Sequence, residues 1–136
     1  MTDRGIRITR LLLIILLVLS SGPAYAGWIA LGENDDEITI YVDIGTIGRK
    51  GNLVKMWSLY DYKAAQSVKG IAFLSTTTQW EFDCAEGRSR VLALKEFSGN
   101  MGKGIVVLDG SVERKLEPAT PESAGLTMWK IACGKR

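Results

Sequence analysis

The sequence predicts a small α+β protein: a single antiparallel sheet of about six strands, a C-terminal helix packed on one face, and one disulfide. Three observations support this fold class. From position 28 onward, short alternating or β-branched runs are separated by Gly, Asn and Asp, which is typical of antiparallel sheet. The last segment has helical periodicity. Two cysteines are placed so that one crosslink can join that helix to the sheet.

Residues 1–26 have the three-part organisation of a secretory signal peptide. Three arginines begin the segment, the apolar run Leu11–Leu19 follows, and the small-x-small pattern Ala24-Tyr25-Ala26 closes it. A membrane span needs about 20 apolar residues, so this run is too short to be an anchor. No cysteine that could carry a lipid precedes Cys84. We therefore expect residues 1–26 to be cleaved and the product to be exported through the inner membrane to the periplasm, the cell surface or the medium.

Residues 27–136 have the length of one domain with one hydrophobic core. The formal net charge of +2 belongs to the leader, because the remaining chain carries 14 basic and 14 acidic residues. A neutral domain has no general attraction for nucleic acid or for anionic membranes. We therefore expect neither as a partner, and no membrane anchor after cleavage.

The two cysteines, Cys84 and Cys133, are expected to pair, since an oxidising compartment favours disulfides and two cysteines allow one intramolecular connectivity. A redox or zinc site is disfavoured, because the chain has no C-x-x-C motif and no histidine. The pairing would join the end of the fourth strand to the C-terminal helix.

Turn residues separate the predicted strands. The candidate strands are Trp28–Leu31, Glu37–Val42, Leu53–Tyr60, Ala72–Phe82, Arg88–Phe97 and Ile105–Leu108. Asp43 is expected to cap a short turn at residues 44–47, residues 62–70 to connect two strands, and residues 99–104, with three glycines, to form a flexible hairpin loop.

Alternation predicts the faces of the two longest sheet segments. In the fourth strand Trp80 and Phe82 share one side, while Glu81 and Asp83 share the other. In the fifth strand the apolar side is Val91, Ala93 and Phe97, opposite Arg88, Arg90 and Glu96, and Leu92 and Leu94 interrupt the polar side.

The segment after position 119 has the signals of an amphipathic helix. Thr120 is the expected N-cap, with Pro121 and Glu122 in the first turn. The expected apolar stripe consists of Leu126, Trp129, Ala132 and Cys133, and Gly134 supplies the stop. This helix is predicted to cover one face of the sheet.

No arrangement of residues indicates an enzyme. Without histidine the chain lacks the usual general base and the commonest metal ligand, and its acidic clusters are typical of solvated surface. We therefore predict no catalytic residues, no metal and no cofactor. Exposed aromatic residues beside arginine are typical of protein-binding surfaces. The candidate protein-binding residues are Arg88, Arg90, Lys95 and Lys103.

The chain resembles the surface-adhesin protein E-like family of Gram-negative bacteria. The elements that carry the resemblance are Trp28, Ile40-Tyr41-Val42-Asp43, Thr46-Ile47, Val54-Lys55-Met56-Trp57, Asp61-Tyr62, Glu81-Phe82-Asp83-Cys84 and Ile131-Ala132-Cys133-Gly134. The resemblance implies an antiparallel sheet with a helix against it, tied by a disulfide. It also implies adhesion to host extracellular-matrix and serum proteins.

Two functions follow from these features. The first is an exported, non-enzymatic domain that binds a protein partner through a face or edge of the sheet, with host matrix proteins as candidates. The alternative is a periplasmic structural or accessory protein of the envelope with no host-facing role.

Overall fold

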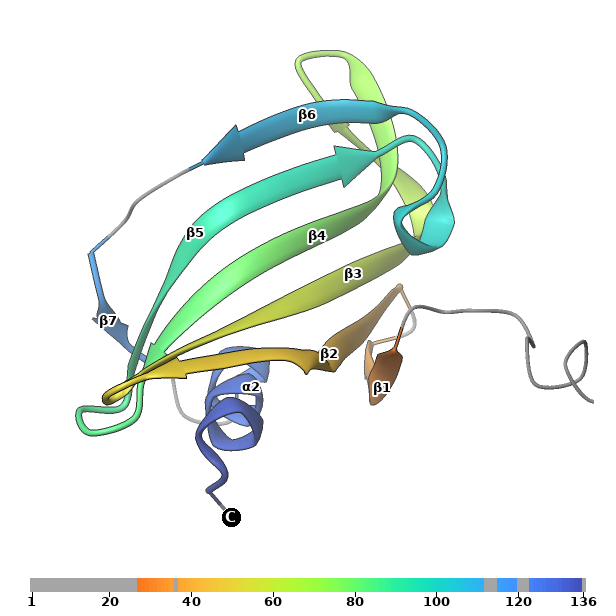
Figure 1. Ribbon diagram of the computed structural model, residues 1–136. Helices are drawn as coiled ribbons and strands as arrows, with labels where there is room; N and C mark the ends of the chain where they lie inside the picture. Colours follow the sequence, from red (N-terminus) through yellow and green to blue (C-terminus); the bar gives the residue numbers. More distant parts are fainter. Residues whose placement is uncertain (1–26, 36, 112–114, 120–122, 136) are drawn as a thin grey trace, which may run out of the picture.

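A computed structural model describes residues 27–35, 37–111, 115–119 and 123–135 of the chain (Figure 1). Its elements are β1 (Trp28–Asp35), β2 (Ile38–Lys50), β3 (Leu53–Val68), β4 (Ile71–Asp83), β5 (Arg88–Phe97), the short 3-10 helix η1 (Asn100–Gly102), β6 (Val106–Ser111), β7 (Glu117–Pro118) and α2 (Ala124–Cys133). The expected leader, residues 1–26, lies outside the described residues.

The strands form one curled antiparallel sheet in which β1 to β6 lie in chain order, so that each strand pairs with the next (Figure 1). The two-residue strand β7 also pairs with β5. The sheet therefore confirms the predicted fold class. Over the described residues it contains seven strands, because β7, which no sequence signal indicated, adds to the expected six.

Strand β2 continues through residues 44–47, which were predicted to form a turn. Its register with β3 shifts between Asp43 and Gly48, so the segment is a bulge within the strand. Asp43 Oδ1 accepts the amide of Gly45 at 3.0 Å, and Thr46 Oγ1 accepts the amide of Trp57 at 3.0 Å. These side chains satisfy amides that the ladder leaves unpaired, so the strand resumes after the bulge.

Strand β3 likewise extends to Val68, where the sequence predicted a connection over residues 62–70. A second register shift separates Asp61 from Gln66, and pairing with β4 then resumes. The turn is confined to Lys69 and Gly70, whose φ angles are 51° and 78°. Polar composition in this segment thus reflects an exposed end of the sheet and not a loop.

Strand β5 has its predicted bounds, but its alternation was wrong beyond Val91. Gln79 pairs with Ala93 and Trp80 pairs with Val91, so Leu92 is the extra residue of a bulge. After this bulge, each residue of β5 lies on the face opposite to the one that strict alternation predicts. Leu94 and Glu96 consequently share a face with Val91, while Ala93 and Phe97 join Arg88 and Arg90 on the opposite face.

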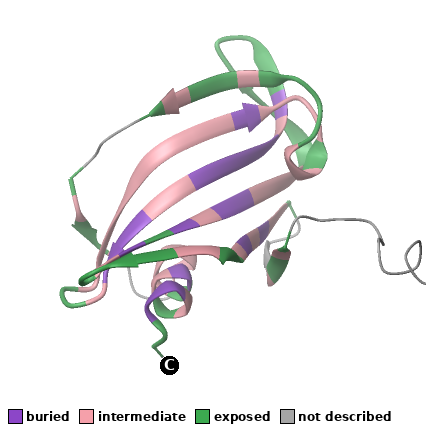
Figure 2. Cartoon of the chain, viewed as in Figure 1, coloured by how far each residue is buried: buried purple, intermediate pink, exposed green. Residues whose placement is uncertain are grey.

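Helix α2 packs across one face of the sheet, here called the helix face; the other is the outer face. Phe82 and Met56 on the sheet and Met128 on the helix are fully buried, and Ala132 is 3 % exposed. Figure 2 shows buried segments both on the sheet and on α2. Leu126 and Trp129 of the predicted stripe are half-buried. Met128, the helical residue buried most deeply, was missing from that stripe.

The N-cap of α2 is Ser123, three residues after the predicted Thr120. Ser123 Oγ accepts the amide of Leu126 at 3.1 Å, as an N-cap should. Thr120, Pro121 and Glu122 lie outside the described residues. The helix ends as expected at Gly134, whose φ of 66° is the left-handed conformation that glycine adopts without strain.

The predicted disulfide joins Cys84, just after β4, to Cys133 at the end of α2, with the Cα atoms 5.5 Å apart. Beside it, Trp129 Nε1 donates to the carbonyl oxygen of Asp83 at 2.8 Å. A covalent and a polar link therefore fasten the helix to the end of β4.

The glycine-rich connection from β5 to β6 lies against the outer face, whereas the sequence predicted a flexible hairpin loop. Ser75 Oγ donates to the carbonyl oxygen of Gly99 at 2.6 Å and accepts the amide of Gly102 at 2.9 Å. Asp61 Oδ1 accepts the amide of Met101 at 2.8 Å. The connection covers Leu59, which is fully buried.

Candidate functional site

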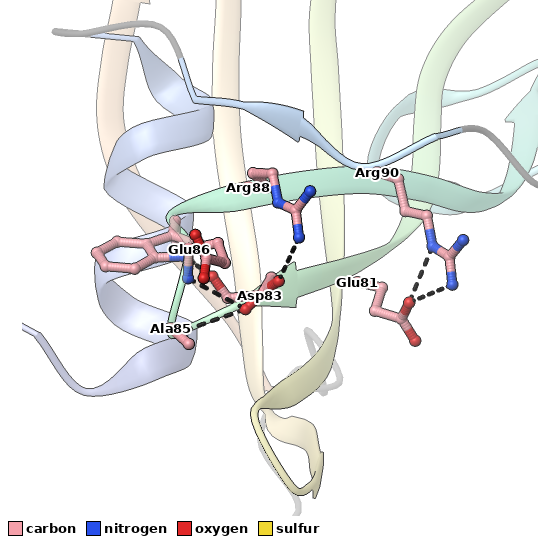
Figure 3. Close-up of polar contacts among 7 residues, drawn as sticks. Glu81, Asp83, Ala85, Glu86, Arg88 and Arg90 are labelled. Atoms are coloured by element: carbon pink, nitrogen blue, oxygen red, sulfur yellow. Dashed lines mark hydrogen bonds and ion pairs between the residues drawn. The ribbon is translucent and has the colours of Figure 1, made fainter.

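Two carboxylates of β4 lie in the middle of cross-strand rows on the outer face. The register places Glu81 between Lys55 of β3 and Arg90 of β5, and the next row places Asp83 beside Arg88. Arg90 Nε donates to Glu81 Oε1 at 2.9 Å, and Arg88 Nη2 donates to Asp83 Oδ2 at 3.0 Å (Figure 3). Directly opposite residues of opposite charge stabilise an antiparallel pair, so these ion pairs follow from the register.

Asp83 also closes the β4–β5 turn. Its Oδ1 accepts the amides of Ala85 at 3.1 Å and Glu86 at 3.2 Å (Figure 3). The hydrogen bond from Arg88 lowers the pKa of Asp83 below its usual value, and the two amides add to the effect, which outweighs the opposing effect of desolvation. Asp83 is therefore a structural carboxylate that stays ionised.

Three cations of the β2–β3 hairpin lie next to these rows. Arg49, Lys50 and Lys55 are exposed, and none forms an ion pair with another described residue. With Glu81 they line a shallow cavity of about 560 Å³. Because Glu81 and Asp83 are paired with arginines, the charge of the two lysines is not neutralised locally. This end of the outer face, which we call the cationic face, is defined by Lys50, Lys55, Arg88 and Arg90.

Trp57 adds an aromatic side chain beside the cationic face. It pairs in register with Asp43 and Gln79, one row from Lys55, and it is half-buried. Trp80, in contrast, lies on the helix face and contacts the core. Of these two tryptophans, Trp57 is therefore the one on the outer face.

The structure brings three of the four predicted protein-binding residues to one face. Arg88, Arg90 and Lys95 lie on the outer face, although both arginines are engaged by carboxylates of β4. Lys103 is exposed at the end of η1, at the opposite end of that face. Contact between these four residues and a partner stays a prediction.

The lysines of the hairpin were missed by the sequence reasoning. The available signal was the Arg49-Lys50 pair next to the turn at Gly51, followed by Lys55. Its meaning depends on the register of β3 with β4, which places Lys55 opposite Glu81. The sequence does not reveal that register.

Within the described residues, no group of three or more His, Cys, Asp or Glu side chains is arranged to hold a metal ion. Over the same residues, none of the helices is both long and apolar enough to pass through a membrane.

The family described as Surface-adhesin protein E matches residues 28–134 of the chain. Among solved structures, crystal form II of Haemophilus influenzae protein E is similar with a TM-score of 0.65 and 16% identity, over 80% of this chain and 88% of that chain. Protein E from non-typeable Haemophilus influenzae is similar with a TM-score of 0.63 and 14% identity, over 83% of this chain and 79% of that chain. At these identities the likeness shows the fold. No curated protein sequence is significantly similar to the chain.

Proposed function

Because the chain belongs to the Surface-adhesin protein E family, we propose that it is an exported, non-enzymatic adhesin-like protein that binds a protein partner through the cationic face. The observation that carries this proposal is the set of cations around Glu81 and Asp83, where two arginines neutralise the carboxylates and two lysines remain. A surface of this kind attracts an acidic segment of a partner. Host extracellular-matrix and serum proteins with acidic segments are the partners we propose.

The ion pairs give the cationic face a fixed geometry. Glu81 holds Arg90 and Asp83 holds Arg88. Partner binding therefore costs little additional conformational entropy at these two guanidinium groups. Arg88 Nε is buried and has no acceptor among the described residues. The Arg88 side chain as a whole is 41 % exposed, so an acidic partner can contact the exposed part of this side chain and not Nε.

Trp57 supplies the apolar part of the proposed contact. Tryptophan and arginine dominate the binding energy of many protein interfaces, whereas peripheral lysines act mainly on the association rate. We therefore assign Trp57 an anchoring role, and Lys50 and Lys55 a steering role.

The test is a binding measurement against a panel of purified host matrix and serum proteins. At least one should bind the wild-type protein, with an affinity that falls between about 50 and 300 mM salt, because screening weakens exposed charges. The double substitution Lys50→Glu and Lys55→Glu should lower that affinity by about tenfold or more, mainly through the association rate. The matched control is Lys69→Glu, an exposed charge reversal in the β3–β4 turn, which should bind like wild type. Equal binding by the double variant would disprove the cationic face as the contact surface.

A periplasmic accessory role is the competing function, and location separates the two. Adhesion to host proteins requires display outside the cell. Protease treatment of intact cells should therefore digest the protein while sparing a periplasmic marker. Survival of the protein alongside the marker would favour the accessory role.

A further inference from the structure

The helix face has an open pocket beyond the area that α2 covers. Its volume is about 310 Å³, and its walls are three aromatic side chains, Tyr60, Tyr62 and Trp80. Thr76 and Thr78 of β4 form the floor, and aliphatic side chains of β5 complete it. This pocket is on the opposite side of the sheet from the cationic face, because Trp80 shares its face with Phe82 and the core.

Two of the aromatic walls are held by contacts outside the pocket. The ring of Tyr62 meets Phe73 edge to face, with centroids 5.8 Å apart. Trp80 stacks on Phe82 at 6.2 Å, and its Nε1 donates to Ser58 Oγ at 2.8 Å. The rings therefore keep their orientation without a ligand, so the entropy cost of immobilising them on binding is small.

Glu96 lies next to residues that line the pocket, on the same face of the sheet. Glu96 is the register partner of Thr76 and shares its face with Leu94, both of which line the cavity. Glu96 is only 8 % exposed and forms no hydrogen bond or ion pair with another described residue. Burial raises the pKa of its carboxyl group, as expected for an anion without a compensating charge. Its oxygens are not among the fully buried polar atoms of the described residues, so a ligand can reach them, and a positive group beside them would favour the ionised form.

We propose that this pocket binds a small ligand carrying a quaternary ammonium group, with the cation against the rings of Tyr60, Tyr62 and Trp80 and neutralised by Glu96. Aromatic faces attract cations, and aromatic cages recognise quaternary ammonium groups in this way. The carboxylate supplies the opposite charge in a site that is partly desolvated. This site is independent of the proposed adhesin function, since it lies on the other face of the sheet.

Quaternary ammonium fits the pocket better than a primary amine does. A primary ammonium carries three N–H donors that need acceptors, whereas a trimethylated nitrogen carries none. The walls are largely aromatic and aliphatic, and Tyr62 OH already accepts a hydrogen bond from Thr76 Oγ1. Such walls favour methyl groups over further donors.

The test is a calorimetric titration of the purified, disulfide-bonded protein with choline. Its uncharged carbon isostere, 3,3-dimethylbutan-1-ol, is the matched control ligand, because it has the same shape without the charge. We expect saturable binding of choline and affinity for the isostere that is weaker by about tenfold or more. A second titration with phosphocholine shows whether the site prefers a free ammonium ligand or a phosphorylated headgroup. Saturable binding of either ligand supports the site.

Protein variants locate the site. Glu96→Gln should lower choline affinity by about tenfold, whereas Glu86→Gln, the same exchange at an exposed turn position, should leave it unchanged. Tyr62→Leu should also weaken binding, and near-ultraviolet circular dichroism checks that each variant is folded. No saturable binding, equal binding of the isostere, or full affinity in Glu96→Gln would each overturn the proposal.

Discussion

Asp83 and Glu96 are both buried carboxylates on the β4–β5 pair, and their surroundings shift their pKa values in opposite directions. Asp83 accepts hydrogen bonds from Arg88 and from two amides, all of which favour its ionised form. Glu96 has no such donors among the described residues, so burial alone acts on it. The first carboxylate therefore stabilises the fold when ionised, and the second destabilises it.

Asp83→Asn should lower thermal stability at neutral pH and make stability less sensitive to acid. The lowered pKa of Asp83 contributes stability above its unfolded value of 3.8, and this contribution is lost as pH falls through the folded pKa. Thermal unfolding between about pH 2 and 7 measures the effect, with wild type and variant converging at low pH. Asp109→Asn, an exposed exchange, is the control. A constant difference at all pH values would contradict the assignment.

Glu96→Gln should have the opposite effect and raise thermal stability at neutral pH. The raised pKa of Glu96 means that stability is greatest below the unfolded value of 4.5 and is lost as pH rises through the folded pKa. The gain from glutamine should therefore vanish below about pH 4, where both side chains are uncharged. The same pH series of unfolding curves measures it, and a variant less stable than wild type at pH 7 would refute the prediction.

At the scale of elements, two side chains of the sheet hold the β5–β6 connection in place. Asp61 accepts hydrogen bonds from Asn100 Nδ2 at 3.1 Å and from the amide of Met101 at 2.8 Å, and Ser75 holds Gly99 and Gly102. The connection thereby covers the far end of the outer face, diagonally opposite α2.

Asp61→Ala should release this connection without unfolding the sheet. Removing the acceptor leaves the amide of Met101 unsatisfied, which costs about 1–3 kcal/mol. Amide hydrogen exchange in residues 99–104 should accelerate while exchange in β4 stays slow, and Asp109→Ala serves as the control. Unchanged exchange in residues 99–104 would show that Asp61 does not anchor the connection.

The sequence was sufficient to predict element types where local signals and tertiary structure agree, as for β5 and for the stop at Gly134. It was insufficient wherever a bulge intervened, because one extra residue such as Leu92 reverses every side chain that follows. It also placed the N-cap at Thr120, whereas the N-cap of α2 is Ser123, a residue type that suits the same position.

For the whole molecule, the coverage of the sheet explains where its two candidate sites lie. Helix α2 covers one end of the helix face, and the η1 connection covers the opposite end of the outer face. The two uncovered areas hold the aromatic pocket and the cationic face. The sequence indicated basic residues on β5, but the lysines that complete the cationic face come from the β2–β3 hairpin, and only the strand order brings them together.

Removing the disulfide should destabilise the whole domain, because it closes a loop of 49 residues and ties α2 to the sheet. Cys84→Ser with Cys133→Ser should lower the free energy of unfolding by about 2–4 kcal/mol, as measured by urea titration. Wild-type protein in reductant should behave like the double variant. An unchanged urea midpoint would contradict the role assigned to this link.

Amide hydrogen exchange of the complex with a bound host protein tests the central proposal most directly, because it identifies the surface that a partner covers. The proposal predicts slower exchange in residues 48–57 and 81–90, the segments that carry Trp57 and the four residues of the cationic face, and no change in α2 or β6. Protection confined to α2 or to β6, with residues 48–57 and 81–90 unaffected, would contradict it.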